Sequence, residues 1–256
     1  HLEDYEKEIS ENTKLLLWVH TSNYIMKGYT KEVPLEDIVS IGKKYKIPVV
    51  ADLGSGSFID MSKFGIPSEI PVSEIVKKGP DITLFSGDKM LGGPQSGIIL
   101  STKILINIIK SNSIYRTVRC DKITIAILDD ILRSYKKNGF LKSNLALMLL
   151  TKNRKTLKKM AEKIINSVQE YKLRTLGLTI ENSMVEAGSG SLPEKNLKSV
   201  TLKFSPKDMS IDVLSKSFKQ YKVPIIGYIN RNSFFIDLKA VLPSQSFHII
   251  DAINKV

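Results

Sequence analysis

Three apolar runs in the first half of the chain each end in a short polar segment. The segments are His20-Thr21-Ser22-Asn23 after Leu15–Val19, Asp52-Leu53-Gly54-Ser55-Gly56 after Ile47–Ala51, and Ser86-Gly87-Asp88-Lys89 after Ile82–Phe85. A glycine-rich stretch, residues 91–97, follows directly. Glycine allows backbone to approach a ligand closely. If the three runs are neighbouring strands, their polar ends converge on one site.

An aspartate after one strand and a lysine after a later one suit pyridoxal phosphate. The aldehyde of this cofactor forms a Schiff base with a lysine amine, and its ring nitrogen needs a carboxylate to stay protonated and draw electrons. Asp52 and Lys89 occur in the order found in aspartate-aminotransferase-like enzymes, and Ser86 precedes the lysine by three residues, where a serine commonly holds the cofactor phosphate. A lone aspartate there is more often a helix cap and a lone lysine a surface residue, but the pair favours the cofactor.

The elements that must position these residues alternate between strands and helices. Strands are predicted over the three runs and over Gly97–Leu100, and helices over residues 34–41, opened by Pro34, and 72–79. This alternation is typical of a mainly parallel sheet with helices against its faces. In such α/β sheets, functional residues gather at the carboxyl ends of the strands.

The second half of the chain has a different pattern. Residues 121–171 show helical spacing with a break near Gly139. Strands are then predicted at Leu176–Ile180, Val200–Phe204, Ile225–Ile229 and Phe234–Leu238, with a helix at Ile211–Tyr221. We therefore expect the C-terminal half of a large α/β domain over residues 1–135, a basic connecting helix over 136–171 and a small α+β domain over 172–256.

The chain of 256 residues carries a formal charge of +12. Between Lys136 and Arg174, eleven basic residues stand against only Glu162 and Glu170. Such an excess attracts polyanions, nucleic acid foremost, because neutralising phosphates releases counterions. A solvated helix face is the simpler explanation from composition alone.

Composition also limits the compartment and the chemistry. Neither a membrane-spanning run nor a secretory signal is visible, so we expect neither a membrane protein nor an exported one. Cys120 is the only cysteine, which favours a reducing cytoplasm. The histidines His1, His20 and His248 are scattered, and no metal site is expected. Because His1 is not an initiator methionine, we expect a fragment or a processed chain.

These motifs resemble those of the bacterial selenocysteine synthases, the L-seryl-tRNA(Sec) selenium transferases. The resemblance lies in the three polar segments, in Leu91–Gly97, and in the further blocks Val118–Lys122, Gly188–Pro193, Pro224–Gly227 and Asp237-Leu238. The Ser-Gly-Asp-Lys block with its glycine-rich follower is the most specific part. The resemblance implies the pyridoxal-phosphate-dependent transferase fold of the aspartate-aminotransferase-like class, fold type I, with a partial large domain and a small C-terminal domain.

The resemblance also implies roles for particular residues. Those implied at the cofactor are Lys89 as its covalent anchor, Asp52 at the ring nitrogen, and His20, Asn23, Ser55 and Ser86 around it. Asp88 is a candidate catalytic proton carrier, with a structural turn carboxylate as the alternative.

Two arginines are implied at the substrate. Arg116 and Arg119 would bind a phosphate-like selenium donor, since arginine grips tetrahedral oxyanions with two N–H groups. Their spacing places both guanidiniums on one face if that stretch is helical. The alternative is a basic helix start on the surface.

The implied reaction converts L-seryl-tRNA(Sec) into L-selenocysteinyl-tRNA(Sec) with selenophosphate, through an aminoacrylyl intermediate. The resemblance further implies a homo-oligomer with sites shared between subunits, and the basic stretch 136–174 is a candidate tRNA contact. Two alternatives stay open. One is a related lyase or aminotransferase that uses the same cofactor on a free amino acid or sugar acid, and the other is a catalytically incomplete fragment.

Overall fold

The computed structural model describes residues 1–20, 28–66, 70–137, 139–187 and 197–256. The chain divides into two compact units, one built mainly from His1–Met148 and the other from Leu149–Glu186 with Asn196–Val256. These bounds differ from the expected divisions at 135 and 171. The stretch predicted as a connector is shared between the units: its part up to Met148 belongs to the first unit, whereas Leu157, Ala161 and Ile164 are buried in the core of the second.

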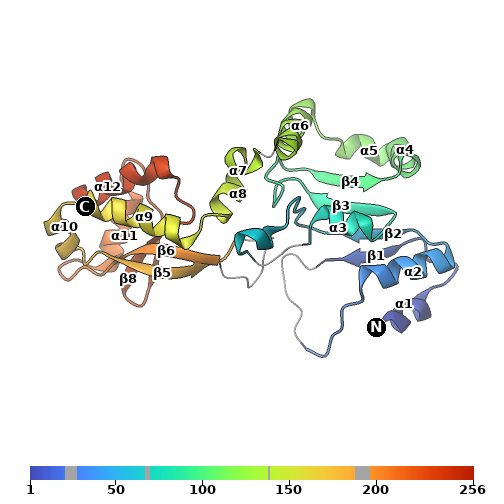
Figure 1. The fold of residues 1–256 in the computed structure, drawn as a ribbon, viewed down its shortest axis with the longest axis horizontal. Helices are drawn as coiled ribbons and strands as arrows, with labels where there is room; N and C mark the ends of the chain where they lie inside the picture. The colour runs from blue at the N-terminus through green and yellow to red at the C-terminus, as the bar shows by residue number, and fades with distance from the viewer. Residues whose placement is uncertain (21–27, 67–69, 138, 188–196) are drawn as a thin grey trace. The chain divides into compact units, whose positions relative to one another are not determined.

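The first unit contains a four-stranded sheet in the order β1-β2-β3-β4 (Figure 1). Its strands are β1 (Leu16–Val19), β2 (Val49–Asp52), β3 (Ile82–Ser86) and β4 (Gly97–Ser101). The pairs β1–β2 and β2–β3 are parallel, and β4 runs antiparallel to β3 at the edge. The predicted mainly parallel sheet is therefore confirmed.

Helices flank and follow this sheet. Those before β4 are α1 (Leu2–Glu8), α2 (Leu35–Tyr45), the 3-10 turn η1 (Met61–Phe64) and α3 (Val72–Lys77). Those after it are α4 (Lys103–Ser111), α5 (Ser113–Val118), α6 (Lys122–Lys136), α7 (Phe140–Ser143) and α8 (Leu145–Leu150). Pro34 is the residue that caps α2, because its missing N–H costs nothing at a helix start.

The core of the first unit lies between the sheet and α2. Trp18 is buried there with Leu35 and Ile38, and its indole N–H donates to the Val33 carbonyl at 3.2 Å. The strand predicted over Leu15–Val19 is present as β1 but is buried on one face only. Leu17 and Val19 are about half exposed, because alternate side chains of a strand point to opposite faces of the sheet.

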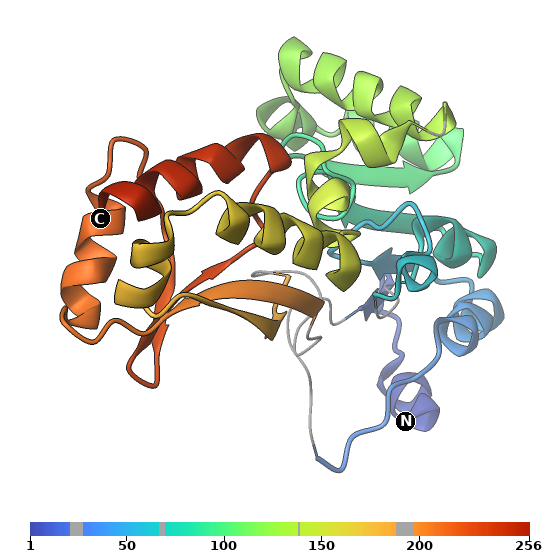
Figure 2. The ribbon, with the colours of Figure 1, turned by 60° about the vertical axis from the view of Figure 1, so that its left-hand side comes forward.

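The second unit is an antiparallel sheet in the order β5-β6-β8-β7. Its elements are α9 (Arg154–Asn166), α10 (Glu170–Thr175), β5 (Thr179–Val185), β6 (Leu197–Phe204), α11 (Ile211–Lys219), β7 (Tyr228–Asn230), β8 (Ser233–Asp237), the 3-10 turn η2 (Pro243–Gln245) and α12 (Ser246–Lys255). Helices α9 and α12 lie side by side against the sheet (Figure 2). This is the small α+β domain that the sequence predicts.

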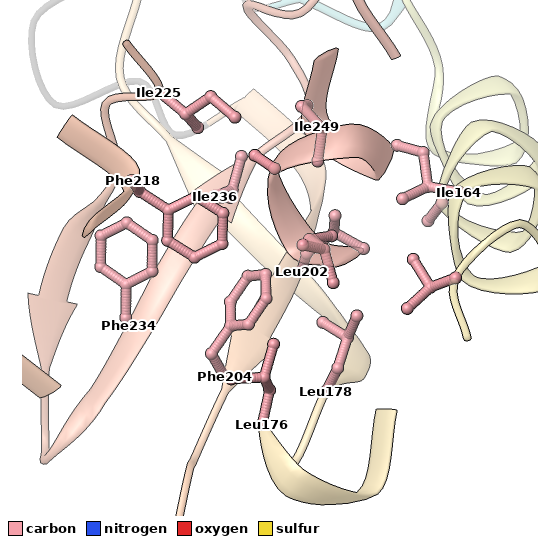
Figure 3. Packing of buried hydrophobic residues seen from close by; sticks show 14 of the residues in the cluster. Ile164, Leu176, Leu178, Leu202, Phe204, Phe218, Ile225, Phe234, Ile236 and Ile249 are labelled. Atoms are coloured by element: carbon pink, nitrogen blue, oxygen red, sulfur yellow. The ribbon is translucent and has the colours of Figure 1, made fainter. Parts of the chain in front are cut away.

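Three phenylalanines form the centre of this second core. The rings of Phe204, Phe218 and Phe234 have centroids 5.2–5.8 Å apart, and all three side chains are fully buried (Figure 3). The strand predicted at Leu176–Ile180 begins only at Thr179. Gly177, with φ of 55°, turns the chain there, so Leu176 and Leu178 are apolar because they pack into the core from a turn.

Candidate active site

Parallel pairing brings the carboxyl ends of three strands to one edge of the first sheet. Val19 lies opposite Asp52, and Asp52 lies opposite Leu84. The His20 N–H donates to the Asp52 carbonyl at 2.8 Å, which continues the ladder one residue beyond β1. Asp52 and Ser86 are the last residues of β2 and β3. The polar segments that the sequence singled out therefore start at the same edge.

Asp52 is half-buried and held by its own turn. Its Oδ1 accepts a hydrogen bond from the Gly54 N–H at 3.0 Å, which fixes the side-chain rotamer. Ser55, three residues on, is buried. A carboxylate with one oxygen anchored in this way has a defined direction, as a partner for a ring nitrogen requires.

The turn after β2 depends on one glycine. Gly56 has φ of 68°, and a Cβ built there would lie 2.7 Å from the Phe85 ring and 2.8 Å from the Ser86 carbonyl oxygen. No other residue fits this position without moving the backbone, because the contact involves main-chain atoms. The glycine thus lets the two polar segments approach each other.

Lys89 lies in the turn that follows β3. Two hydrogen bonds join the end of β3 and this turn to the segment after β2: the Ser86 N–H donates to the Gly54 carbonyl at 3.3 Å, and the Met90 N–H donates to the Ser55 carbonyl at 3.1 Å. Lys89 is half-buried, and Asp88 beside it is exposed. The backbone therefore places the lysine next to the turn that begins with Asp52.

His20 is oriented by an aromatic neighbour. Its ring stacks on Trp18 with centroids 5.8 Å apart and an angle of 13° between the ring planes. Since Trp18 is anchored in the core, the imidazole has a supported position at the edge of the sheet. Asn23, predicted beside it, lies outside the described residues.

The glycine-rich stretch folds back on the lysine turn. The Gly87 N–H donates to the Ser96 carbonyl and the Gly93 N–H to the Gly87 carbonyl, both at 2.8 Å. Gly92 has φ of 72°, and a Cβ there would collide with the Asn144 side chain at 2.2 Å. Gly92 is therefore needed for close packing against Asn144 within the protein.

Two residues that support the site were missed by sequence reasoning. The Asn144 Nδ2 donates to the Leu91 carbonyl at 2.7 Å, and the Tyr135 hydroxyl donates to the same carbonyl at 3.0 Å. Asn144 is buried, and burial raises the pKa of Tyr135 to about 12, which keeps its hydroxyl a donor. Nothing in the sequence pattern links residues 135 and 144 to residue 91, about fifty positions away, so only the tertiary structure identifies them.

The two arginines predicted at the substrate are both exposed. Arg116 lies in the last turn of α5, whereas Arg119 follows the end of this helix with ψ of 126°. The condition of a continuous helix over both residues is therefore not met, because α5 ends at Val118. Exposure leaves both guanidiniums accessible to an anion.

Within the described ranges, three or more histidine, cysteine or acidic side chains do not gather as a metal site would need. Over the same part of the chain, every helix is too short or too polar to cross a membrane.

The chain matches the L-seryl-tRNA selenium transferase family over residues 1–242. It is 38% identical over 244 residues to the L-seryl-tRNA(Sec) selenium transferase of Carboxydothermus hydrogenoformans, covering 95% of this chain and 52% of that protein. The corresponding enzyme of Alkaliphilus oremlandii is 37% identical over 257 residues, covering 100% of this chain and 55% of the relative. The chain spans about half the length of the curated relatives it matches.

Among solved structures, the chain is similar to D-glucosaminate-6-phosphate ammonia-lyase, with a TM-score of 0.63 and 16% identity over 100% of this chain and 60% of that one. A likeness at this identity concerns the fold alone. It confirms the predicted fold class: a partial, mainly parallel α/β domain of fold type I followed by a small α+β domain.

Proposed function

Because the chain belongs to the L-seryl-tRNA selenium transferase family, we propose that the protein to which it belongs converts L-seryl-tRNA(Sec) into L-selenocysteinyl-tRNA(Sec) with pyridoxal phosphate as cofactor. The observation that carries this proposal is the joining of the Lys89 turn to the Asp52 turn by two backbone hydrogen bonds. Family membership alone does not ensure that these two residues come together.

The groups at the sheet edge fit this cofactor. Lys89 offers an amine for the aldehyde, Asp52 a carboxylate for the ring nitrogen, and Ser55 and Ser86 hydroxyls for the phosphate. His20 and Asn23 complete the proposed set, with His20 held by its stacking on Trp18. When bound, pyridoxal phosphate supplies an electron sink for the negative charge that develops on the substrate α-carbon.

The chain's own residues would move the protons. The Lys89 amine is the base that removes the proton from the seryl α-carbon. Hydroxide is a poor leaving group, so the β-oxygen needs a proton as it departs. The candidates for this donation are Asp88, which is adjacent to Lys89 and exposed, and a residue outside this chain.

Selenium would then form a bond to the β-carbon from selenophosphate, and its Se–P bond would be cleaved by water, which releases inorganic phosphate. Arg116 and Arg119 are assigned to this donor because guanidinium forks bind tetrahedral oxyanions and remain charged at all physiological pH values. Both side chains are exposed, as binding of a soluble anion requires.

We also propose that the protein is a cytoplasmic homo-oligomer. Helices α4, α5 and α6 contain no buried residue, and Ile104, Val118 and Ile123 are each about 70% exposed. Exposed apolar side chains on three consecutive helices favour contact with another subunit. The reducing compartment follows from the single cysteine, as above.

The alternative of a lyase for a free sugar acid has less support. The ammonia-lyase shares 16% identity with this chain, which concerns the fold only, whereas the selenium transferases share 37–38% identity over nearly all of it. A selenophosphate-dependent assay on seryl-tRNA with the full-length gene product separates these two activities.

The cofactor assignment is tested on the 256-residue chain itself. We expect added pyridoxal phosphate to give a Schiff-base absorbance band, and borohydride reduction followed by mass spectrometry to place the adduct on Lys89. Lys89→Ala should abolish both signals, whereas the exposed-lysine control Lys110→Ala should retain them. An adduct that is spread over surface lysines, or one that survives in Lys89→Ala, contradicts the proposal.

A further inference from the structure

The two faces of the second sheet have opposite character. Val200, Leu202 and Phe204 of β6 belong to the core that α9, α11 and α12 cover. The alternate residues Thr201 and Lys203 point to the other face. Among the described residues, the helices that pack on this sheet lie on the apolar side (Figure 2).

The polar face holds a shallow depression of about 340 Å³. The residues that line it come from the four strands and the turn between β7 and β8, and they include Thr201, Lys203, Tyr228, Asn230, Arg231 and Phe235. On this face Thr201 is buried, the acidic Glu181 lies beside Lys203, and Tyr228, Asn230 and Arg231 are exposed.

Two aromatic rings form a flat platform in this depression. Tyr228 on β7 lies opposite Phe235 on β8, and their rings are stacked with centroids 5.2 Å apart and planes 10° from parallel. Tyr228 remains 44% exposed, so its ring offers surface to a further planar group. Stacking on an aromatic ring is how proteins bind the face of an unpaired base.

Charged and polar side chains from the adjacent strands and from the β7–β8 turn lie around the platform. The Lys203 ammonium pairs with Glu181 at 2.9 Å, which orients the lysine across the sheet. Arg231 is exposed in the β7–β8 turn, next to Asn230. Burial and the negative charge of Asp237 raise the pKa of Tyr228, so its hydroxyl stays a hydrogen-bond donor.

We propose that this face binds unpaired nucleotides of an RNA strand, with a base stacked on Tyr228 and the strand's phosphates near Lys203 and Arg231. A duplex does not fit this arrangement, because its bases are stacked on one another and hide their faces. The inference rests on the proposed function, since the single-stranded end of a tRNA is the RNA segment that such an enzyme must hold.

The test uses the 256-residue chain and a short fluorescent single-stranded RNA that carries 2-aminopurine. We expect 2-aminopurine fluorescence to be quenched on binding, and Tyr228→Ala to weaken binding about tenfold, as truncation of one stacking ring does. Tyr228→Phe keeps the ring and should retain the affinity. The matched control is Phe247→Ala, which removes an aromatic side chain that is 58% exposed on α12.

Competition and cross-linking give a second readout that does not depend on the stability of a variant. A blunt-ended duplex of the same composition should compete poorly with the single strand. Photocross-linking with 4-thiouridine should modify residues of β7 and β8. Cross-links confined to the lysines of α9, or equal affinity for wild type and a folded Tyr228→Ala, overturn the proposal.

This experiment contains neither pyridoxal phosphate nor a selenium donor. If the RNA results hold while Lys89 fails to take the cofactor, the proposed function falls and the RNA platform remains. If Lys89 takes the cofactor while RNA binding ignores Tyr228, the platform falls and the proposed function remains.

Discussion

The helices of the two units share an amphipathic pattern but differ in what they bury. In the second unit, α9 and α11 place Leu157, Ile164 and Phe218 in the core with no exposed surface. In the first unit, α4 has apolar residues at helical spacing, yet Ile104 and Ile108 are 74% and 60% exposed. Amphipathic spacing predicts a helix in both cases, but burial requires a facing surface, which the described chain supplies only for the second set.

The interactions that stabilise the interior of each unit also differ. The second unit is stabilised by a dense cluster of phenylalanines, whereas the edge of the first unit that carries Lys89 depends on backbone hydrogen bonds and on two side chains bonded to the Leu91 carbonyl. A polar, glycine-rich edge can present functional groups. A packed phenylalanine core cannot, because its side chains are wholly occupied by one another.

The largest expected effect comes from the phenylalanine cluster. Phe204→Ala should lower the free energy of unfolding of the second unit by about 3–5 kcal/mol, the usual cost of removing a buried aromatic ring. Hydrogen exchange at the amides of β6 measures this loss. Trp18, the only tryptophan, lies in the separate core of the first unit, so the transition seen by its fluorescence should shift much less.

The control for this variant is Phe247→Ala, whose ring is mostly exposed and whose removal should cost under about 1 kcal/mol. If Phe204→Ala destabilises the second unit, measured by hydrogen exchange at β6, and the first unit, measured by Trp18 fluorescence, by the same amount, the two cores unfold as one. That result would contradict the view that each unit has its own independent core.

A smaller effect is expected at the polar anchor of the first unit. Asn144→Ala removes the bond to the Leu91 carbonyl and the acceptor of the Leu147 N–H, and should cost about 1–3 kcal/mol. Trp18 fluorescence during denaturant unfolding measures it. Asn107→Ala, on the exposed side of α4, should change stability by less than about 0.5 kcal/mol. If both variants behave alike, Asn144 is not an anchor.

The smallest effect concerns the surface charges of the second unit. Asp251 accepts a hydrogen bond from the Tyr221 hydroxyl and pairs with Lys222 and Lys255, both at 2.9 Å, and these contacts hold its pKa well below the ordinary value. A lowered folded-state pKa adds stability above the unfolded value of about 3.9, and this stability is lost as the pH falls below it.

Asp251→Asn should therefore flatten the acid limb of the stability profile of the second unit, with little change in the first. Because the Asp251 side chain is 31% exposed and its two lysine partners are about 60% exposed, the difference should shrink at high salt. Asp208→Asn, at an exposed carboxylate of the same unit, serves as the control. If the stability of Asp251→Asn falls with decreasing pH as steeply as that of the wild type, other groups cause the acid sensitivity.

Much of the first sheet was predictable because its strands are short apolar runs that end in polar or glycine-rich segments. Val49–Asp52 and Ile82–Ser86 differ by only one or two residues from the predicted strands. The less successful predictions concern residues that are buried by segments far away in the sequence. Leu176 and Leu178 look like a strand but pack into the core from the turn before β5, and the helical stretch predicted as a connector is divided between the two units at Met148.

The same contrast separates the parts of the candidate site. Lys89, Asp52 and Ser86 were candidates from the sequence because the proposed cofactor needs particular residue types and because parallel strands bring their carboxyl ends to one edge, where the structure places these segments. Asn144 and Tyr135 were not found, because a hydrogen bond across some fifty residues leaves no periodic trace in the sequence.

The order of residues alone determined the fold class and the family of this protein, because both depend on local apolar spacing and on short motifs. The tertiary structure alone decided which apolar faces are covered, which side chains support the lysine turn and which face of the second sheet its helices cover. These features depend on the distance between segments far apart in the chain, and that distance is set only when the two cores have packed.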